Sequence, residues 1–182
     1  MTDADQFEAF VRRYQDMVFA TALRLLGKVA EAEDVAQTVF LRAFQRFDEI
    51  GPSTTAAGWL KTVTRNECLN HLTRYRSRWR LFSELGPGAS EGSETAFEDT
   101  LVADGSPALE LEQSDVRRQL ERGLRELPDH QRVPLVLFHF EDMSYQDIAD
   151  TIGASLGKVK TDIHRGREAL KRLLVSDDDA SR

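Results

Sequence analysis

The side chains best suited to bind another molecule lie near the C-terminus, within residues 156–173. Polar and basic residues there occupy the outer faces of a segment whose apolar residues recur every three or four positions, as in an α-helix. They are Lys158, Lys160, Thr161, His164, Arg165, Lys171 and Arg172. Cationic groups neutralise phosphates, and side-chain donors recognise base edges in the major groove. The segment therefore predicts DNA binding by a basic amphipathic helix.

The turn before this segment carries the signals that end one helix and begin the next. Ser144 and Asp147 have the spacing of a capping box, in which a serine oxygen accepts from backbone N–H groups. Gly153 stands where a helix end favours the left-handed conformation, and Ser155 can cap the following helix. Residues 143–172 therefore predict a helix-turn-helix with its second helix in the major groove. The alternative is a helical hairpin with a solvated basic face.

A second group of basic residues lies in the middle of the chain, and the segment after it differs in composition. Residues 59–80 form a predicted helix with Glu67 as its single acid and with interleaved aromatic residues. Residues 83–108 contain acidic but no basic side chains and are rich in glycine, serine and proline. This change predicts a flexible acidic linker between two domains.

Helical periodicity predicts the remaining elements, and no strand pattern appears. Helices are expected at residues 7–26, 30–47, 59–80, 109–127 and 133–140, ahead of the helix-turn-helix, with a loop at 48–58. We therefore expect an all-α fold of two small helical domains joined by the flexible acidic linker, the C-terminal one containing the helix-turn-helix. The domains are residues 1–82 and 109–175, followed by a disordered tail at 176–182.

The charge and composition of the whole chain restrict the possible functions. The net charge is −7, so DNA must be bound by local basic patches on an acidic body. No apolar run approaches the ~18 residues of a membrane span, and the N-terminus lacks an apolar signal segment. We therefore expect a cytoplasmic protein without membrane insertion.

The side chains used in catalysis and metal binding are sparse. The histidines are scattered, without acidic partners at metal-ligand spacing. Cys68 falls on an apolar stripe, which favours a buried structural thiol over a nucleophile. We expect no catalytic residue, no metal, no cofactor and no enzymatic activity.

Three stretches together resemble one family. They are EAEDVAQTVFLRAF at residues 31–44, WLKTVTRNECLNHLTRYRSR at 59–78, and LPDHQRVPLVLFHFEDMSYQDIADTIGASLGKVKTDIHRGREAL at 127–170. In order and spacing they are similar to the extracytoplasmic-function (ECF) group of bacterial RNA polymerase sigma factors, within the sigma-70 family. The resemblance implies a protein that binds core RNA polymerase, at its clamp helices and flap, and directs transcription from promoter DNA. It leaves open an anti-sigma factor as a further partner.

The resemblance implies two surfaces in the first domain. Asp34 and Gln37, supported by Glu31 and Glu33, would bind the polymerase clamp, with Thr38 beside them. The -10 element of the promoter would be melted by the third helix. Basic residues would hold its single strand, namely Lys61, Arg65, Arg74, Arg76 and Arg78. Asn66 would recognise a flipped base, or else would hydrogen-bond within its own domain.

In the second domain, the resemblance implies recognition of the -35 element as duplex DNA. Lys160, Thr161, His164 and Arg165 would face the groove, while Lys158, Lys171 and Arg172 would contact phosphates or stay solvated. Asp162 stands among them at a position that is commonly basic in the family, which should weaken phosphate contact locally. The acidic linker would either mimic nascent RNA near the polymerase active centre or serve as a solubilising tether.

Thr38 departs from the family pattern, because an acid is expected there. Either the neighbouring acids supply enough charge, or phosphorylation of Thr38 adds the missing charge and makes the factor depend on a kinase. A different class of protein also stays open. A dimeric helix-turn-helix repressor or activator, acting without core polymerase, would explain the C-terminal domain but would leave the basic third helix without a role.

Overall fold

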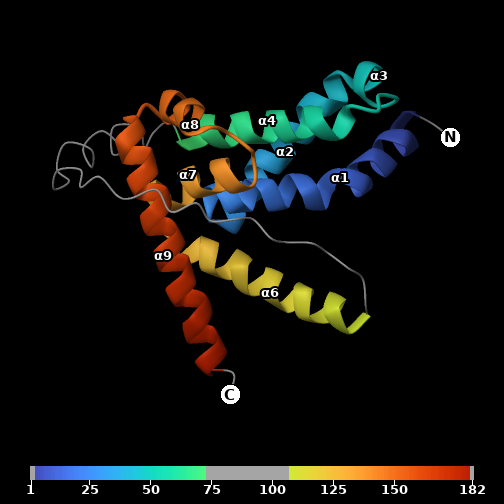
Figure 1. Cartoon of the computed structure of the whole chain (residues 1–182). Coiled ribbons are helices and arrows are strands. Elements are labelled where there is room, and N and C mark those ends of the chain that lie inside the picture. Colours follow the sequence, from blue (N-terminus) through green and yellow to red (C-terminus); the bar gives the residue numbers. More distant parts are fainter. Residues whose placement is uncertain (1–2, 73–106, 181–182) are drawn as a thin grey trace.

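The structure, a computed structural model, describes residues 3–72 and 107–180. The first range contains α1 (Asp3–Leu26), α2 (Val29–Gln45), α3 (Phe47–Ile50) and α4 (Ala56–Leu72). The second contains α6 (Pro107–Glu126), α7 (Asp129–His139), α8 (Tyr145–Ile152) and α9 (Leu156–Ala180). Every element in the described ranges is a helix, which confirms the prediction of an all-α fold (Figure 1).

The N-terminal region is built on α1, which packs against both α2 and α4. Gly27 has φ +73°, a left-handed conformation that glycine adopts easily, and it turns the chain between α1 and α2. Val18, Leu25, Val39 and Leu60 are fully buried between these helices. This packing fixes the outer faces of α2 and α4, where the predicted polymerase and -10 residues lie.

The C-terminal region contains the predicted helix-turn-helix, formed by α8 and α9. The Ser144 hydroxyl oxygen accepts from the Asp147 backbone N–H at 3.1 Å and so caps α8. Gly153 ends α8 in the left-handed conformation, with φ 71°. Ser155 Oγ then accepts from the Lys158 backbone N–H at 3.2 Å, at the start of α9. The local signals in the sequence are therefore confirmed one by one.

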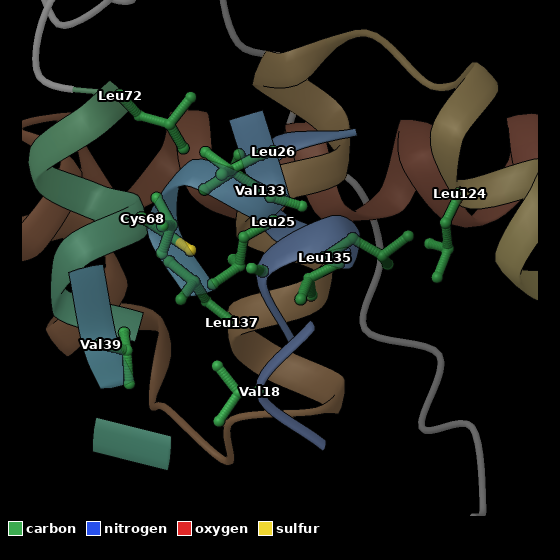
Figure 2. Packing of buried hydrophobic residues seen from close by; sticks show 14 of the residues in the cluster. Val18, Leu25, Leu26, Val39, Cys68, Leu72, Leu124, Val133, Leu135 and Leu137 are labelled. Atoms are coloured by element: carbon green, nitrogen blue, oxygen red, sulfur yellow. The ribbon is translucent and has the colours of Figure 1, made fainter. Parts of the chain in front are cut away.

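The two helical regions are packed together rather than separate. Helix α7 lies against α1 and α9, and α6 contacts both α1 and α9 (Figure 1). Figure 2 shows Leu25 of α1, Cys68 of α4 and Leu137 of α7 within one cluster of buried side chains. The C-terminal end of α6 lies beside α9, and from there the two helices diverge, α6 toward its own N-terminal end and α9 toward the C-terminus of the chain (Figure 1).

Several predicted boundaries need correction. The expected loop at 48–58 contains most of α3 and the start of α4, and α7 begins at Asp129 rather than near residue 133. Pro107 was placed in the linker but begins α6, as proline can at a first helical position. The chain from Ser176 to Ala180 was expected to be disordered but continues α9, because extending an existing helix is much easier than starting one.

Two further expectations concern membrane insertion and the residues of the linker and the -10 surface. Each helix in the described part of the chain is too short or too polar to cross a membrane. Most of the predicted linker, and Arg74, Arg76 and Arg78 of the predicted -10 surface, lie outside the described residues.

Candidate interfaces for DNA and polymerase

The surface predicted to meet the -35 element lies on α9. Val159 and Ile163 are buried and hold one side of the helix against the rest of the region. On the outer side, the exposed residues include Lys160, His164, Arg165, Lys171 and Arg172. Thr161 is half-buried, and its hydroxyl donates to the Gly157 carbonyl at 2.9 Å. The structure thus brings together most of the basic residues predicted on this helix.

Lys158 and Asp162 lie differently from the others. Asp162 was expected among the outward residues, but its exposed fraction is 1%, so it lies inside the region and not toward DNA. Lys158 Nζ donates to both carboxylate oxygens of Asp162 at 2.6 Å. Burial raises the pKa of Asp162, while the hydrogen bond from Lys158 opposes that rise. The charge of Lys158 is therefore balanced within the protein.

The predicted -10 residues on α4 divide into exposed and covered groups. Asn66 is exposed, and its amide makes no hydrogen bond to the other residues that the structure describes. Lys61 and Arg65 are half-buried. Lys61 Nζ donates to the Phe140 carbonyl at 3.1 Å, so this residue is engaged by the C-terminal region.

Glu141 follows Phe140 in the chain and lies near the contact between Lys61 and the Phe140 carbonyl. Burial raises the pKa of Glu141, and the positive charges of Lys61, Arg65 and Arg24 oppose that rise. A carboxyl group from the C-terminal region thus interacts electrostatically with two basic residues that were predicted to hold single-stranded DNA.

The predicted polymerase surface lies on the outer face of α2. Glu33, Asp34 and Gln37 are exposed, as a docking surface requires. Glu31 is less available, because its carboxylate pairs with Lys28 at 3.0 Å and lies 3.3 Å from His71 Nε2.

Two apolar side chains on this helix were missed in the sequence analysis. Leu41 is 60% exposed and Phe44 is 59% exposed. Leu41 follows Asp34 by seven positions, which places it on the same side of the helix. This spacing could have identified Leu41 as a surface residue from the sequence. An apolar residue in line with Asp34, Gln37 and Thr38 shares their exposed face of the helix and does not belong to the core.

Thr38 lies within this stripe and is half-buried. Its hydroxyl donates to the Asp34 carbonyl at 3.0 Å, a local bond that leaves the backbone of α2 intact. The position is helical, and its side chain reaches the same outer face as Asp34. This geometry suits both interpretations of Thr38: a residue whose acidic neighbours supply enough charge, and a phosphorylation site that adds the missing charge.

We expect Thr38→Glu and Thr38→Ala to bind core polymerase within about threefold of the wild type, because a single exposed charge contributes little. Affinity measured with labelled chain, together with transcription from a promoter template, tests this. If Thr38→Glu bound and transcribed much better than both the wild type and Thr38→Ala, phosphorylation would become the preferred interpretation.

Cys68 is a buried thiol without a catalytic setting. Burial, with smaller contributions from the carboxylates of Glu141 and Glu67, raises its pKa well above the usual range for cysteine. Within residues 3–72 and 107–180, no cluster of His, Cys, Asp and Glu side chains could hold a metal ion. The described surfaces are suited to binding macromolecules.

The sequence analysis also missed residues that join the two regions. Arg132 is 3% exposed, and its guanidinium donates to the Leu26 carbonyl at 3.0 Å and to the Leu127 carbonyl at 2.8 Å. Arg24 pairs with Glu121 at 2.6 Å. The sequence gives one indication of a special role for Arg132, because a basic residue there begins the apolar run of α7. It does not indicate that Arg132 contacts the end of α1.

An all-α chain with an exposed helix-turn-helix and a second polar helix surface defines a DNA-binding regulator. Comparison with known families gives the particular class. The family model for Sigma-70 region 2 matches residues 10–78, and the model for Sigma-70 region 4 matches residues 117–170.

Whole-chain relatives agree with these matches. The chain is 30% identical to the ECF RNA polymerase sigma factor SigW of Bacillus subtilis, over 94% of this chain and 90% of that protein. It is 32% identical to the ECF sigma factor SigE of Mycolicibacterium smegmatis, over 93% of this chain and 62% of that protein. Among solved structures, the sigma factor RpoE of Bartonella quintana, in complex with the anti-sigma factor NepR, is 22% identical with a TM-score of 0.46, covering 94% of this chain and 98% of that one.

The chain belongs to the ECF sigma factors of the sigma-70 family. As such it binds core RNA polymerase and promoter DNA and directs promoter-specific transcription initiation. The dimeric repressor or activator, which remained open from the sequence, is not favoured.

Proposed function

We propose that this sigma factor divides its work among three surfaces. The outer face of α2, with Asp34 and Gln37, docks on the polymerase clamp helices, and the C-terminal region meets the flap. The surface of α4 around Asn66 recognises the melted -10 element. The outer face of α9, with Lys160 and Arg165, recognises the -35 duplex. Because polymerase and promoter DNA occupy the cytoplasm, the proposal places the protein there.

The observation that carries this proposal is that different helices expose different kinds of polar side chains. Acid and amide groups are exposed on α2, an exposed amide lies on α4, and exposed basic groups cluster on α9. Negative charge suits a protein partner with a basic surface, whereas the amide suits the edge of an unpaired base. A basic helix held by a helix-turn-helix suits the major groove. No single partner would need all three surfaces.

We expect the isolated chain to bind promoter duplex weakly, and to bind it strongly once core polymerase is added. Each basic patch is small, and polymerase would fix the two regions on one template, which raises the effective concentration of the second contact. Gel shifts with and without core polymerase, followed by in vitro transcription from a library of upstream sequences, test this expectation.

The control is Arg118→Ala, which removes an exposed basic residue on α6, away from all three surfaces. It should leave binding and transcription unchanged. Tight, sequence-specific binding by the isolated chain, with no gain from polymerase, would contradict the proposal. It would instead favour a dimeric helix-turn-helix repressor or activator.

A further inference from the structure

A stack of aromatic and cationic side chains joins α7, α8 and α9, which pack against one another. The rings of Phe138 on α7 and Tyr145 on α8 are stacked, with centres 4.6 Å apart and planes 9° apart. Lys160 Nζ of α9 lies 5.9 Å from the centre of the Tyr145 ring. The guanidinium of Arg167, also on α9, lies 5.6 Å from the centre of the Phe138 ring. Each ring of the pair thus interacts with a cation of α9.

The two rings are held in place by their own surroundings. Tyr145 is the first residue of α8, and the Ser144 cap fixes the start of that helix. Both rings are half-buried and pack against the buried side chains of the core. Arg167 Nε donates to His139 Nε2 at 3.0 Å, which restrains the guanidinium near Phe138. The ring pair is therefore fixed by contacts that do not involve the lysine.

Lys160 is restrained in a different way from Lys158. Lys158 Nζ donates to both carboxylate oxygens of Asp162, so its charge is balanced and its donors are partly used within the protein. Lys160 is exposed, and within the described part of the chain its ammonium makes no hydrogen bond or ion pair. A ring face attracts an ammonium at distances up to ~6 Å through its quadrupole and occupies no N–H donor. The Tyr145 ring can therefore restrain Lys160 while leaving its donors for a base edge.

This restraint matters because an unrestrained lysine is a poor reader of sequence. Its ammonium is a point charge on a flexible stem and reaches phosphates and base edges alike. An ammonium held in one position loses less conformational entropy on binding and reaches a smaller part of the groove. Lysine donors suit the O6 and N7 acceptors of guanine in the major groove. A restrained Lys160 would therefore discriminate between base pairs rather than add general affinity.

We propose that Tyr145 is a positioning residue for -35 recognition, whose ring holds the Lys160 ammonium in place to donate to a base edge. This inference rests on the proposed function, which places the outer face of α9 against the -35 duplex. Tyr145 acts through its ring and not through its hydroxyl. Phe138 and Arg167 support that ring from α7 and α9.

Three substitutions separate the ring from the hydroxyl and from general packing. Tyr145→Phe keeps the ring and removes the hydroxyl. Tyr145→Leu removes the ring but keeps an apolar side chain beside Phe138. Tyr14→Leu is the matched control, because Tyr14 of α1 is also half-buried and also interacts with a cation, the Arg13 guanidinium at 5.4 Å from its ring centre.

The binding test uses holoenzyme and duplex promoters in which each -35 base pair is changed in turn. The starting promoter is one selected by transcription from the library of upstream sequences. Tyr145→Leu should bind this promoter about two- to fivefold more weakly, as expected for one lost cation–π contact. It should also lose base preference at the same position as Lys160→Ala. Tyr145→Phe and Tyr14→Leu should keep the wild-type preference at every -35 position.

Double-mutant cycles test whether Tyr145 acts through Lys160. Tyr145→Leu should have no further effect on binding when Lys160 is already Ala, whereas its effect should be undiminished when Arg165 is Ala. Additive effects of Tyr145→Leu and Lys160→Ala would overturn the inference. Equal losses from Tyr145→Phe and Tyr145→Leu would also overturn it, because they would assign the hydroxyl to a phosphate contact.

A nuclear magnetic resonance measurement on the free full-length chain separates the inference from the proposed function. Ring currents should shift the Cε protons of Lys160 upfield in the wild type and in Tyr145→Phe. The shift should vanish in Tyr145→Leu, with unchanged helix content by far-UV circular dichroism. Absence of the shift in the wild type would overturn the positioning role, whether or not Tyr145→Leu folds. If the shift is present but Lys160→Ala leaves -35 recognition unchanged, the proposed DNA contact of Lys160 is wrong, and the positioning role falls with it.

Discussion

Arg132→Ala should lower the free energy of unfolding by about 3 kcal/mol, a larger loss than for any exposed basic residue of this chain. The guanidinium donates to carbonyls at the end of α1, to the Leu127 carbonyl and to the Asp129 carboxylate. Removing it leaves the three carbonyls buried without this donor, whereas the Asp129 carboxylate, 39% exposed, can still bond to water. Opening of the two regions would admit water to the α1 carbonyls and so would limit the loss.

Urea unfolding followed by circular dichroism measures this effect. Arg118→Ala is the control, since among the described residues Arg118 pairs with exposed groups on α6, and its loss should change stability by less than about 0.5 kcal/mol. A loss below about 1 kcal/mol for Arg132→Ala would show that the buried guanidinium is not a principal support of the packing between α1 and α7.

Lys160→Ala and Arg165→Ala should each weaken recognition of the -35 duplex by about 1–3 kcal/mol if the side chain contacts a base edge. The physical reason is the loss of an exposed side-chain donor on α9, which the proposed function places toward the groove. Asn66→Ala should leave closed-complex formation unchanged and should reduce promoter opening, because Asn66 lies on the other surface, on α4.

Holoenzyme binding to duplex promoters and permanganate reactivity at the -10 region separate these effects. Lys160→Ala should show weaker binding but normal opening once it is bound, and Asn66→Ala the reverse. Normal opening with Asn66→Ala, combined with blocked opening after normal binding in Lys160→Ala, would exchange the proposed roles of α4 and α9.

Features that depend on neighbouring residues were predictable from the sequence. The capping serine of α8, the left-handed Gly153 and the apolar stripe of α9 all depend on spacings of a few residues, and each was confirmed. Asp142 has φ 52°, a left-handed conformation that aspartate enters more readily than most residues. Short-range signals suffice here because caps and turns satisfy their own backbone groups.

Features that depend on which helices meet were not predictable. Asp162 follows Val159 by three positions and precedes Gly166 by four, so the same pattern fits either the inner edge of α9 or its polar side. Its burial depends on where α7 packs, and periodicity within α9 does not contain that information. The contact of Arg132 with α1 joins residues more than a hundred positions apart, and no local spacing indicates such a partner.

The capping of α1 by Arg132 also has a consequence for synthesis on the ribosome. Leu25 and Leu26 are translated 107 and 106 residues before Arg132, respectively. Chains emerge from the N-terminus first, so α1, α2 and α4 can form before α7 exists. Until then only water can bond the last carbonyls of α1. Each nascent chain therefore presents its α4 surface uncovered, and the contact of Lys61 with the Phe140 carbonyl must wait for the last third of the protein to be made.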